Sequence, residues 1–496
     1  MKLKVKDIGI SSGGPLIAVL NHEDAAQFDL HVMDRVKLRK GSKIETAVVD
    51  IAESRKIIPR GKLGLFEEVL ASLELKNNES VEMTIARKPL SIDYIKKKLD
   101  GKELSKKEID QIVWDIVHNK LSQVELTYFV AACYTNVMNL KETIMLTKSM
   151  VEHGDVLKLN KYPIIDKHSI GGIPGNRTTM VVVPIIAAAG YFIPKTSSRS
   201  ITSAAGTADT MEVLANVTFP IDEMKKIVLK TKGCIVWGGA LNLAPADDKI
   251  ISVERPLEID AESQLLASIM AKKHAVSSTH ILIDVPVGKS AKVKNIGEAL
   301  KLKREFEKIG KKLNKHVKVI LTDGKQPIGN GIGPALEARD VLWLLKRDPR
   351  RPMDLENKCL AMCANIFSMV GIKNGYRKAL EILNSGKAYQ KMVEIIKAQK
   401  GKEVPAEDLK IGKYSYDVLS AKSGRIIEID NLFISRIARI AGAPRHKGAG
   451  IYLYKHLGNK VKRGEKLFTI YSESEHEMEY AIDVAKSSRV FVVKSY

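Results

Sequence analysis

The sequence predicts an α/β protein with an added helical domain and a small domain at each end. Three observations lead to this prediction. Apolar residues alternate in strand fashion up to about Arg87, recur with a helical period from Pro89, and form buried strands separated by helices from Pro163. A chain of 496 residues is long enough for about two to four domains with well-filled cores. We therefore expect four parts along the chain.

The composition is that of a soluble globular protein, with 45% hydrophobic and 28% charged residues. The longest apolar run, from Val181 to Ile193, contains Pro184 and is too short to cross a bilayer. No signal peptide is visible, and four cysteines without a framework spacing indicate a reducing compartment. We expect a cytoplasmic protein with no membrane partner.

The formal net charge of +22 needs a physical cause. Basic surfaces bind nucleic acids, but here the lysines are spread along the whole chain and no basic motif with interleaved aromatic residues occurs. A composition rich in lysine and isoleucine also suits the solvated surface of a thermophile's protein. We favour a surface that attracts small phosphorylated anions, and we expect no nucleic-acid partner.

Residues 1–87 are predicted to form a small pseudo-symmetric β-barrel. An apolar spacing occurs in it twice, first as Leu30, Val36 and Leu38 and then as Leu75, Val81 and Met83. Two similar β-units of this kind resemble a double-psi barrel. Nothing in this part supplies catalytic chemistry, so we interpret it as an assembly or scaffold module.

A helical domain is predicted over residues 88–160, completed by about 244–276. Two capping boxes mark helix starts in it, Ser105 with Glu108 and Ser122 with Glu125. Apolar residues with a helical period follow each box. The second segment is mainly helical too, and we expect it to return to this domain.

The α/β domain is predicted over residues 161–243 and about 277–410. Its buried strands end near Ile165, Pro194, Trp237, Val285 and Leu321. The stretch from Tyr376 to Lys400 is predicted to be helical.

A C-terminal α+β domain is predicted over residues 411–496. The segment from Gly458 to Ile470 resembles the lipoyl-like hammerhead hairpin. No lysine sits at an obvious attachment turn for lipoate or biotin, so we interpret this domain as structural.

Two loops rich in glycine and hydroxyl groups are expected to leave the carboxyl ends of two strands of the α/β domain. The first contains Gly171, Gly172 and Gly175, and the second runs from Thr196 to Thr207. Ligands bind at this edge of an open α/β sheet, and backbone N–H groups there attract anions. We therefore predict a phosphate site, to which a cation and hydroxyl groups would come from Lys167, Ser169, Ser198, Ser203 and Thr207.

Three segments of this domain together resemble the thymidine and pyrimidine nucleoside phosphorylase family: Lys167-His168-Ser169-Ile170-Gly171-Gly172, the loop from Ser198 to Thr207, and Gln326-Pro327-Ile328-Gly329. The resemblance covers about residues 89–496. It implies the helical-plus-α/β fold shared with anthranilate phosphoribosyltransferase, cleavage of a glycosidic bond by inorganic phosphate, and closure of a cleft between the two domains.

The same resemblance implies no metal and no organic cofactor, because inorganic phosphate is the co-substrate. It assigns roles to residues of this chain by their match to the family's motifs. The residues implied for phosphate are Lys167, Ser169, Ser197 or Ser198, and Thr207, and those implied for the base side are His168, Ser268 and Lys272.

Departures from that family point to a nucleotide substrate. The family has an aromatic residue in the loop after the strand at Val285, where this chain has Lys292, and Lys289 is a further added cation. An extra cation there implies an extra negative group on the substrate. These features and the N-terminal barrel resemble the archaeal AMP phosphorylases, which convert AMP and phosphate into adenine and ribose 1,5-bisphosphate.

This closer resemblance implies an aspartate that protonates the leaving base, and the matching position is Asp260. The residues that it implies for AMP binding are Gly172, Ser198, Arg199, Ser200, Ile201, Thr202, Ser203, Thr207, Ser268 and Lys292. We expect AMP as the substrate and leave CMP and UMP open beside it.

Most of these residues also have a purely structural interpretation. Asp260 could cap a helix, and His168 could only orient its loop. Arg199 could pair with a core carboxylate. Ser268 could be a packed small residue, and Lys272 a solvated one.

Two other functions stay open from the sequence. A plain pyrimidine nucleoside phosphorylase would act on uridine or thymidine, and a nucleic-acid-binding protein on an inactive scaffold would use the positive charge. We expect a homo-oligomer, a dimer or higher, because the barrel and the C-terminal domain both suit assembly.

Overall fold

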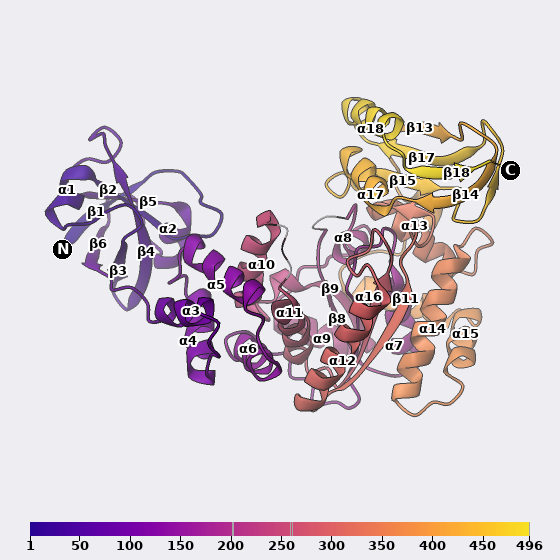
Figure 1. Ribbon diagram of the computed structural model, residues 1–496, viewed down its shortest axis with the longest axis horizontal. Helices are drawn as coiled ribbons and strands as arrows, with labels where there is room; N and C mark the ends of the chain where they lie inside the picture. The colour runs from indigo at the N-terminus through magenta and orange to yellow at the C-terminus, as the bar shows by residue number, and fades with distance from the viewer. Residues whose placement is uncertain (201–202, 258, 260, 496) are drawn as a thin grey trace. The chain divides into compact units, whose positions relative to one another are not determined.

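The computed structural model describes residues 1–200, 203–257, 259 and 261–495 (Figure 1). The chain forms two compact units. One contains Met1–Gly154 and Ala244–Ala271, and the other contains Asp155–Leu243 and Lys272–Tyr496. Each unit is therefore built from segments that lie far apart in the sequence.

Six strands of the first unit close into a barrel in the order β1-β5-β2-β4-β3-β6. Alternate side chains point inward, so that Val36, Leu38, Val81 and Met83 are all buried in one core. The small barrel that the alternating pattern predicts is confirmed. Its elements are β1 (Lys2–Asp7), β2 (Ile17–Asn21), α1 (His22–Gln27), β3 (Arg35–Lys40), β4 (Lys43–Ala52), β5 (Lys62–Leu65), α2 (Glu67–Leu73) and β6 (Ser80–Ile85).

Six helices form the rest of this unit among the described residues. Four follow the barrel in the sequence, and two come mainly from the later segment Ala244–Ala271. Both predicted capping boxes are formed, since Ser105 and Ser122 accept from the backbone at Glu108 and Glu125, whose carboxylates bond back. The helices are α3 (Ser91–Leu99), α4 (Lys106–Val117), α5 (Gln123–Thr135), α6 (Leu140–Glu152), α10 (Pro245–Leu257) and α11 (Glu262–Ala275). The predicted helical bundle is thus present.

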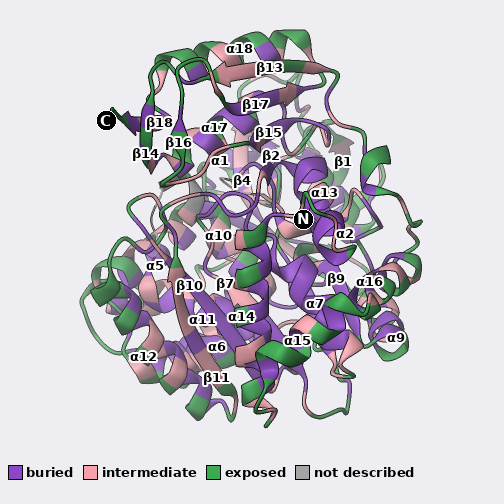
Figure 2. Ribbon diagram, turned by 90° about the vertical axis from the view of Figure 1, so that its right-hand side faces the viewer, coloured by how far each residue is buried: buried purple, intermediate pink, exposed green. Residues whose placement is uncertain are grey.

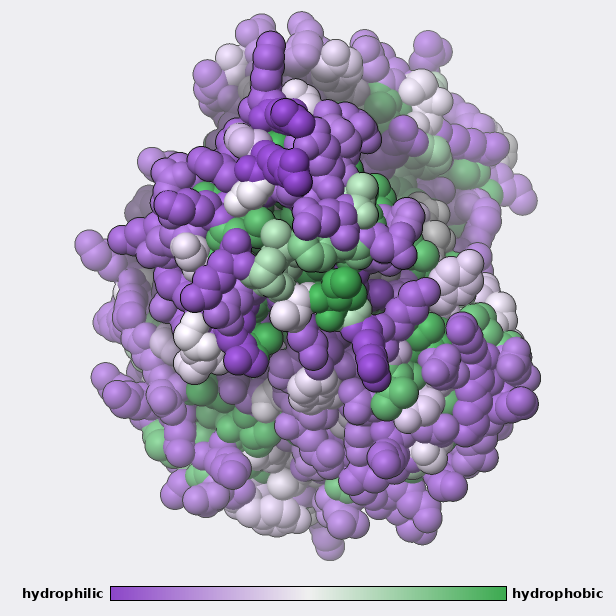
Figure 3. Space-filling model, turned by 90° about the vertical axis from the view of Figure 1, so that its left-hand side faces the viewer, coloured by the Kyte–Doolittle hydropathy of each residue, from purple (hydrophilic) through white to green (hydrophobic). Residues whose placement is uncertain are grey.

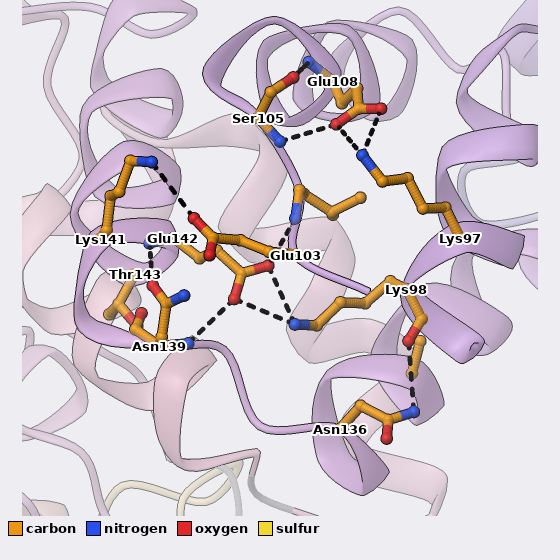
Figure 4. Close-up of polar contacts among 12 residues, drawn as sticks. Lys97, Lys98, Glu103, Ser105, Glu108, Asn136, Asn139, Lys141, Glu142 and Thr143 are labelled. Atoms are coloured by element: carbon orange, nitrogen blue, oxygen red, sulfur yellow. Dashed lines mark hydrogen bonds and ion pairs between the residues drawn. The ribbon is translucent and has the colours of Figure 1, made fainter. Parts of the chain in front are cut away.

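Glu142 is a buried carboxylate that ties three parts of this bundle together (Figure 4). Lys98 Nζ on α3 lies 2.9 Å from Glu142 Oε1. The backbone nitrogens of Leu104 and Asn139 donate to the same carboxylate at 2.9 and 3.0 Å. A buried charge is tolerated only when it is paired and hydrogen-bonded, so this contact fixes α3, the segment before α4, and the start of α6 in one arrangement.

Parallel strands form the centre of the second unit. The sheet β11-β10-β7 and the pair β8-β9 are joined by a bridge between Ile164 and Phe192, so the α/β architecture is confirmed. The strands are β7 (Ile165–Ser169), β8 (Ile193–Ser197), β9 (Gly233–Trp237), β10 (His280–Val287) and β11 (His316–Asp323). Their carboxyl ends hold the loops that the sequence singles out.

Helices cover this sheet and supply most of the core. Residues Thr178 to Ala187 of α7 are buried on every side, whereas an outer helix such as α12 exposes one face (Figure 2). The helices are α7 (Thr178–Ala188), α8 (Thr207–Met211), α9 (Ile221–Thr231), α12 (Ile296–Lys312), α13 (Pro334–Leu345), α14 (Met353–Met369), α15 (Gly375–Asn384) and α16 (Lys387–Ala398). The predicted helical stretch from Tyr376 to Lys400 contains two helices, α15 and α16, with a break at Gly386, whose φ is +75°.

The C-terminal part forms two small sheets with the orders β12-β15-β17-β13 and β16-β14-β18. Strand β12 (Gly331–Ile332) comes from the α/β part and pairs with β15, so the two parts share a sheet. Strands β16 and β17 lie in different sheets and do not pair as a hairpin. The elements are β13 (Tyr414–Leu419), β14 (Gly424–Ile429), α17 (Asn431–Ile440), β15 (Gly450–Leu453), β16 (Lys460–Val461), β17 (Lys466–Ser472), α18 (Glu475–Ser487) and β18 (Phe491–Lys494).

The surface agrees with the composition. Hydrophilic residues cover most of the face in Figure 3, with hydrophobic residues in smaller groups among them. Exposed lysines such as Lys2 and Lys141 pair with nearby carboxylates, here Glu82 and Glu103. Within the described part of the chain, no helix is long and apolar enough to span a membrane.

Candidate functional site

The candidate site lies in the second unit, at the carboxyl ends of β7, β8 and β10. Strands β7 and β10 are parallel and in register, with Ser169 beside Asp284. The carboxyl ends of parallel strands meet at one edge of a sheet, which is where ligands bind in this class of fold. The loops that follow these strands carry most of the residues implied for phosphate and nucleotide.

Lys167 and Ser169 belong to one buried polar network. Lys167 Nζ lies 2.6 Å from Thr178 Oγ1. Ser169 Oγ donates to Asp284 Oδ2 at 2.9 Å and accepts from Asn176 Nδ2 at 3.2 Å. The network therefore holds the lysine and the serine of β7 against the start of α7.

Burial and neighbouring charges shift the pKa values of Lys167 and Asp284 in this network. Burial lowers the pKa of Lys167 to about 8, although the Asp284 carboxylate acts in the other direction. Burial opposes ionisation of Asp284, but Lys358 and Lys167 outweigh it and bring the pKa of that carboxyl below its usual value. Lys358 Nζ lies 3.2 Å from Asp284 Oδ2. Near neutral pH the edge of the sheet thus holds two ammonium groups around one carboxylate.

A second group of buried lysines lies around His168, and burial lowers the pKa of one of them, Lys195, well below its usual value. Lys195 on β8 and Lys273 on α11 are both buried, and Lys273 Nζ lies 3.0 Å from Asp166 Oδ2. Burial, followed by Lys273 and Lys195, lowers the pKa of His168 well below its usual value. The imidazole is therefore neutral at pH 7, and it is suited to a hydrogen bond with a neutral group rather than to pairing with an anion.

The glycine turn after β7 lies against the loop that carries Lys292. Gly171 and Gly172 have φ angles of +92° and +88°, which favour glycine. A Cβ on Gly172 would lie 2.8 Å from the backbone nitrogen of Lys292 and 3.4 Å from its Cγ. The loop after β10 therefore contacts the glycine turn after β7, and Lys292 lies beside Gly172.

Arg199 is held by carboxylates of its own unit. Its Nη2 lies 2.5 Å from Glu212 Oε1, its Nη1 lies 3.1 Å from Asp209 Oδ1, and the guanidinium lies 4.9 Å from the Trp237 ring centroid. Asp209 Oδ2 also accepts from the backbone nitrogens of Ser200 and Gly206 at 2.7 and 2.9 Å. The structural interpretation of Arg199 is therefore realised, and its contacts shape the second loop.

The hydroxyl groups of that loop differ in what they contact. Ser197 Oγ is buried and has no hydrogen-bond partner among the described residues. Ser203 Oγ donates to the Ala205 carbonyl at 2.9 Å, Ser200 Oγ donates to the Ser203 carbonyl, and Ser198 is exposed. Ile201 and Thr202 lie outside the described residues. Ser197 is thus the buried hydroxyl in this loop with spare hydrogen-bonding capacity.

Arg177 joins the two loops, and sequence reasoning missed it. Its Nη1 donates to Thr207 Oγ1 at 2.9 Å, and its Nε lies 2.5 Å from Glu337 Oε2 on α13. Glu337 also accepts from Thr210 Oγ1 at 3.0 Å. Asp284, Asn176, Thr178, Lys195 and Lys358 were missed as well, although the single carboxylate in the apolar strand from Ile281 to Val285 was a usable signal.

The remaining predicted residues have different outcomes. Ser268 and Lys272 lie on α11 and are half-buried, Ser268 in the part that belongs to the first unit. Lys272 contributes to the positive surroundings of His168. Lys289 Nζ lies 2.7 Å from Glu428 Oε1 and its side chain is 85% exposed, so its ammonium pairs with the C-terminal part. Asp260 lies outside the described residues.

No group of three or more His, Cys, Asp or Glu side chains that could hold a metal ion occurs in the part of the chain that the structure describes. The described side chains of the site are mainly lysines and hydroxyl groups, and such groups bind phosphate. The arrangement is able to position an anion and stabilise charge without covalent catalysis.

Three family models match the chain in order. Residues 92–154 match the helical bundle domain of a glycosyl transferase family, and residues 161–389 match the a/b domain of the same family. Residues 426–491 match the pyrimidine nucleoside phosphorylase C-terminal domain. The candidate site lies within the second of these matches.

Relatives of known name align over almost the whole chain. The AMP phosphorylase of Pyrococcus furiosus is 47% identical over 98% of this chain and 96% of its own length. AMP phosphorylase 1 of Archaeoglobus fulgidus is 46% identical over 97% of this chain and 95% of its own length. Among solved structures, anthranilate phosphoribosyltransferase from Thermus thermophilus matches with a TM-score of 0.52 at 17% identity, covering 62% of this chain and 100% of its own, which shows a shared fold.

Proposed function

Because the chain belongs to the AMP phosphorylase family, we propose that it cleaves AMP with inorganic phosphate to give adenine and ribose 1,5-bisphosphate. The protein is a pentosyltransferase. We propose that it needs no cofactor. The observation that carries the proposal is the cluster of buried lysines at the carboxyl ends of β7 and β8, with Lys167 and Lys195 on neighbouring strands beside neutral His168. Such a cluster suits a substrate that brings its own negative charge.

Inorganic phosphate is proposed to bind Lys167, Ser169, Thr207 and a hydroxyl of Ser197 or Ser198. Lys167 and Ser169 are already oriented by Thr178 and Asn176, so little reorganisation is needed when phosphate arrives. The buried Ser197 Oγ without a partner among the described residues supports that serine over exposed Ser198. A phosphate oxygen would attack C1′ of the ribose as the bond to the base breaks.

The nucleotide is proposed to contact Gly172, Lys292 and the loop from Ser198 to Ser203. Lys292 would pair with the 5′-phosphate, which a nucleoside lacks. Arg199 is bound to Glu212 and Asp209, so its proposed role is to hold this loop in shape for AMP.

Asp260 is proposed to donate a proton to the leaving adenine, so that the electrons of the broken bond stay on a neutral base. His168, Ser268 and Lys272 are proposed to contact the base. A neutral His168 suits this role, since a neutral imidazole both donates and accepts hydrogen bonds.

Several finer expectations join this proposal. CMP and UMP would be further substrates, the protein would be cytoplasmic, and it would form a homodimer or a higher oligomer. The double-psi form of the barrel and the lipoyl-like form of the C-terminal domain are proposed on the sequence resemblance alone.

The test incubates the protein with phosphate and either AMP, adenosine, uridine or thymidine. We expect ribose 1,5-bisphosphate and adenine from AMP at a rate at least tenfold above that with any nucleoside, as roughly 1.4 kcal/mol of added binding to a phosphate would give. Equal or faster cleavage of uridine or thymidine would instead identify a pyrimidine nucleoside phosphorylase. Binding to an oligonucleotide in moderate salt with no phosphorolysis would identify a nucleic-acid-binding protein.

A further inference from the structure

A pocket of about 370 Å³ lies within the first unit, between the barrel and the start of the helical bundle. Nothing in the phosphorolysis proposal uses it. The barrel contributes through β3, β4 and the segment after β6, and the helical bundle contributes through α4 and the segment that follows it. The lining residues are Arg35, Lys37, Thr46, Ile85, Ala86, Arg87, Pro89, Leu90, Gln111, Asp115 and Lys120.

The pocket has a cationic side and an apolar side. Lys37, Arg87 and Lys120 bring positive charge to it from three different segments, and Lys37 and Arg87 are not buried. Ile85 and Leu90 are 58% and 63% exposed, and they are the large aliphatic side chains among the lining residues. Together they form a surface suited to a molecule with both an anionic group and an apolar ring or chain.

One wall of the pocket is rigid because Arg35 is already fully engaged in structure. It is buried, its Nε donates to the Lys120 carbonyl at 3.1 Å, and its Nη2 forms an ion pair with Glu125. Glu125 is in turn fixed by the capping box of α5. Arg35 therefore does not need a ligand, and it holds Lys120 in place between the barrel and the bundle.

Asp115, on α4, is one of the lining residues and has an unmet hydrogen-bonding requirement. Its side chain is almost completely buried, and its Oδ1 accepts from Gln111 Nε2 at 3.1 Å. Its Oδ2 is buried with no hydrogen-bond partner among the described residues. A buried carboxylate oxygen in this state is unfavourable, so an N–H or O–H group of a ligand would be stabilised there.

The cations of the pocket act on one another. Lys120 Nζ lies 3.8 Å from the Trp114 ring centroid. Burial lowers the pKa of Lys120, Asp115 opposes this, and Lys37 lowers it further. Lys37 and Lys120 are thus close enough to repel each other, and an anion between them would relieve that repulsion.

We propose that this pocket, which shares no residue with the candidate catalytic site, binds a small phosphorylated molecule of mononucleotide size. The phosphate group would lie among Lys37, Arg87 and Lys120, the ring against Ile85 and Leu90, and an amino or hydroxyl group near Asp115. A volume of about 370 Å³ is at the lower end for small-molecule pockets, which favours a single nucleotide over an extended polymer.

The test measures AMP binding by calorimetry without inorganic phosphate, so that no turnover occurs. It compares the double variant Lys37→Ala/Arg87→Ala with the matched control Arg39→Ala/Lys88→Ala. The control removes the same charge from the same strand and the same segment, but its residues do not line the pocket. We expect one AMP per chain to be lost, or weakened at least tenfold, in the first variant and retained in the control.

Trp114 supplies a local readout, since Lys120 lies over its ring. AMP should change the tryptophan fluorescence of the protein, and the part of this change that comes from the pocket should vanish in Trp114→Phe and in the first double variant. This result does not depend on AMP cleavage, so a failure of the proposed phosphorolysis would leave it standing.

Three outcomes would overturn the proposal. Identical AMP binding in both double variants would show that the pocket binds no nucleotide. Saturation by inorganic phosphate without competition from AMP would show a simple anion site. A stronger effect of the first double variant on oligonucleotide binding than on AMP binding would show a nucleic-acid surface.

Discussion

Gly172 packs so closely against the backbone nitrogen of Lys292 that a Cβ on residue 172 would lie only 2.8 Å from it. The turn after β7 and the loop after β10 are therefore fitted to each other, and the absence of a side chain on Gly172 sets the position of Lys292. This contact brings Lys292, which we propose for the 5′-phosphate, next to the glycine turn that follows β7.

Replacement of Lys292 by alanine should raise the KM for AMP by roughly tenfold to a hundredfold, because a charge-assisted bond to a phosphate contributes about 1.5–3 kcal/mol. The KM for adenosine should change little, since adenosine has no 5′-phosphate. Steady-state kinetics with both substrates measure the difference.

The matched control for that variant is Lys289→Ala. Lys289 is in the same loop but pairs with Glu428 on the exposed side, so its removal should leave the KM for AMP within about twofold. Equal losses for AMP and adenosine in Lys292→Ala would remove Lys292 from the 5′-phosphate site.

The pKa of Lys167 sets a limit to phosphate binding at high pH. Burial lowers this pKa to about 8, so the ammonium is present below pH 8 and is lost as the pH rises through that value. Inorganic phosphate keeps its charge in that range. The KM for phosphate should therefore rise above pH 8, by up to about tenfold per pH unit.

Initial rates at several phosphate concentrations, from about pH 8 upward, where inorganic phosphate stays a dianion, measure this profile. Lys167→Arg is the informative control because arginine stays charged throughout, so its profile should be flat even if its activity is lower. A wild-type KM for phosphate that does not change across this range would mean that Lys167 does not bind the attacking phosphate.

The parts of the site that the sequence predicts are those encoded locally. The turn at Gly171 and Gly172 follows from glycine spacing. Outside the site, the capping boxes of the helical bundle follow in the same way from residues three positions apart. Strand ends and loops follow from periodicity, so the edge at which β7 and β8 deliver their loops could be found without the structure. Periodicity marks the stretch around Gly386 as helical, but it does not show that this left-handed residue separates α15 from α16.

The partners of these residues could not be predicted, because they come from distant segments. Asp284 reaches Ser169 only because β10 pairs with β7 in one register, and Glu337 reaches Arg177 from α13. The assignment of Arg199 depends on the same kind of information. Its pattern allowed either a substrate or a carboxylate, and only the positions of Glu212 and Asp209 show which carboxylates it contacts.

Replacement of Asp260 by asparagine should lower kcat for AMP by about 10²–10⁴-fold, which is the usual contribution of a general acid. AMP binding, measured by calorimetry without phosphate, should change less than about threefold, because asparagine keeps the shape and a hydrogen-bonding group. Glu262→Gln, which neutralises a carboxylate two positions later, should keep kcat within about threefold. An unchanged kcat in Asp260→Asn, with lower thermal stability, would identify Asp260 as a helix cap.

Stability should depend strongly on the buried pair formed by Lys98 and Glu142 (Figure 4). Glu142→Gln leaves the Lys98 ammonium buried without a counter-charge, and breaking a buried pair in this way is unfavourable by about 3–5 kcal/mol. Denaturant unfolding should show this loss. Glu103→Gln removes a carboxylate from the exposed pair with Lys141 in the same bundle, and it should change the free energy of unfolding by less than about 1 kcal/mol.

The double variant Lys98→Met/Glu142→Leu separates the charge from the packing. It removes both charges and fills most of the space with apolar atoms, so it should recover part of the loss, as replacements of buried pairs by apolar residues often do. The backbone nitrogens of Leu104 and Asn139 would still lose their acceptor, which sets a limit to the recovery. If Glu142→Gln and Glu103→Gln were equally mild, the pair would not be what holds α3 against α6.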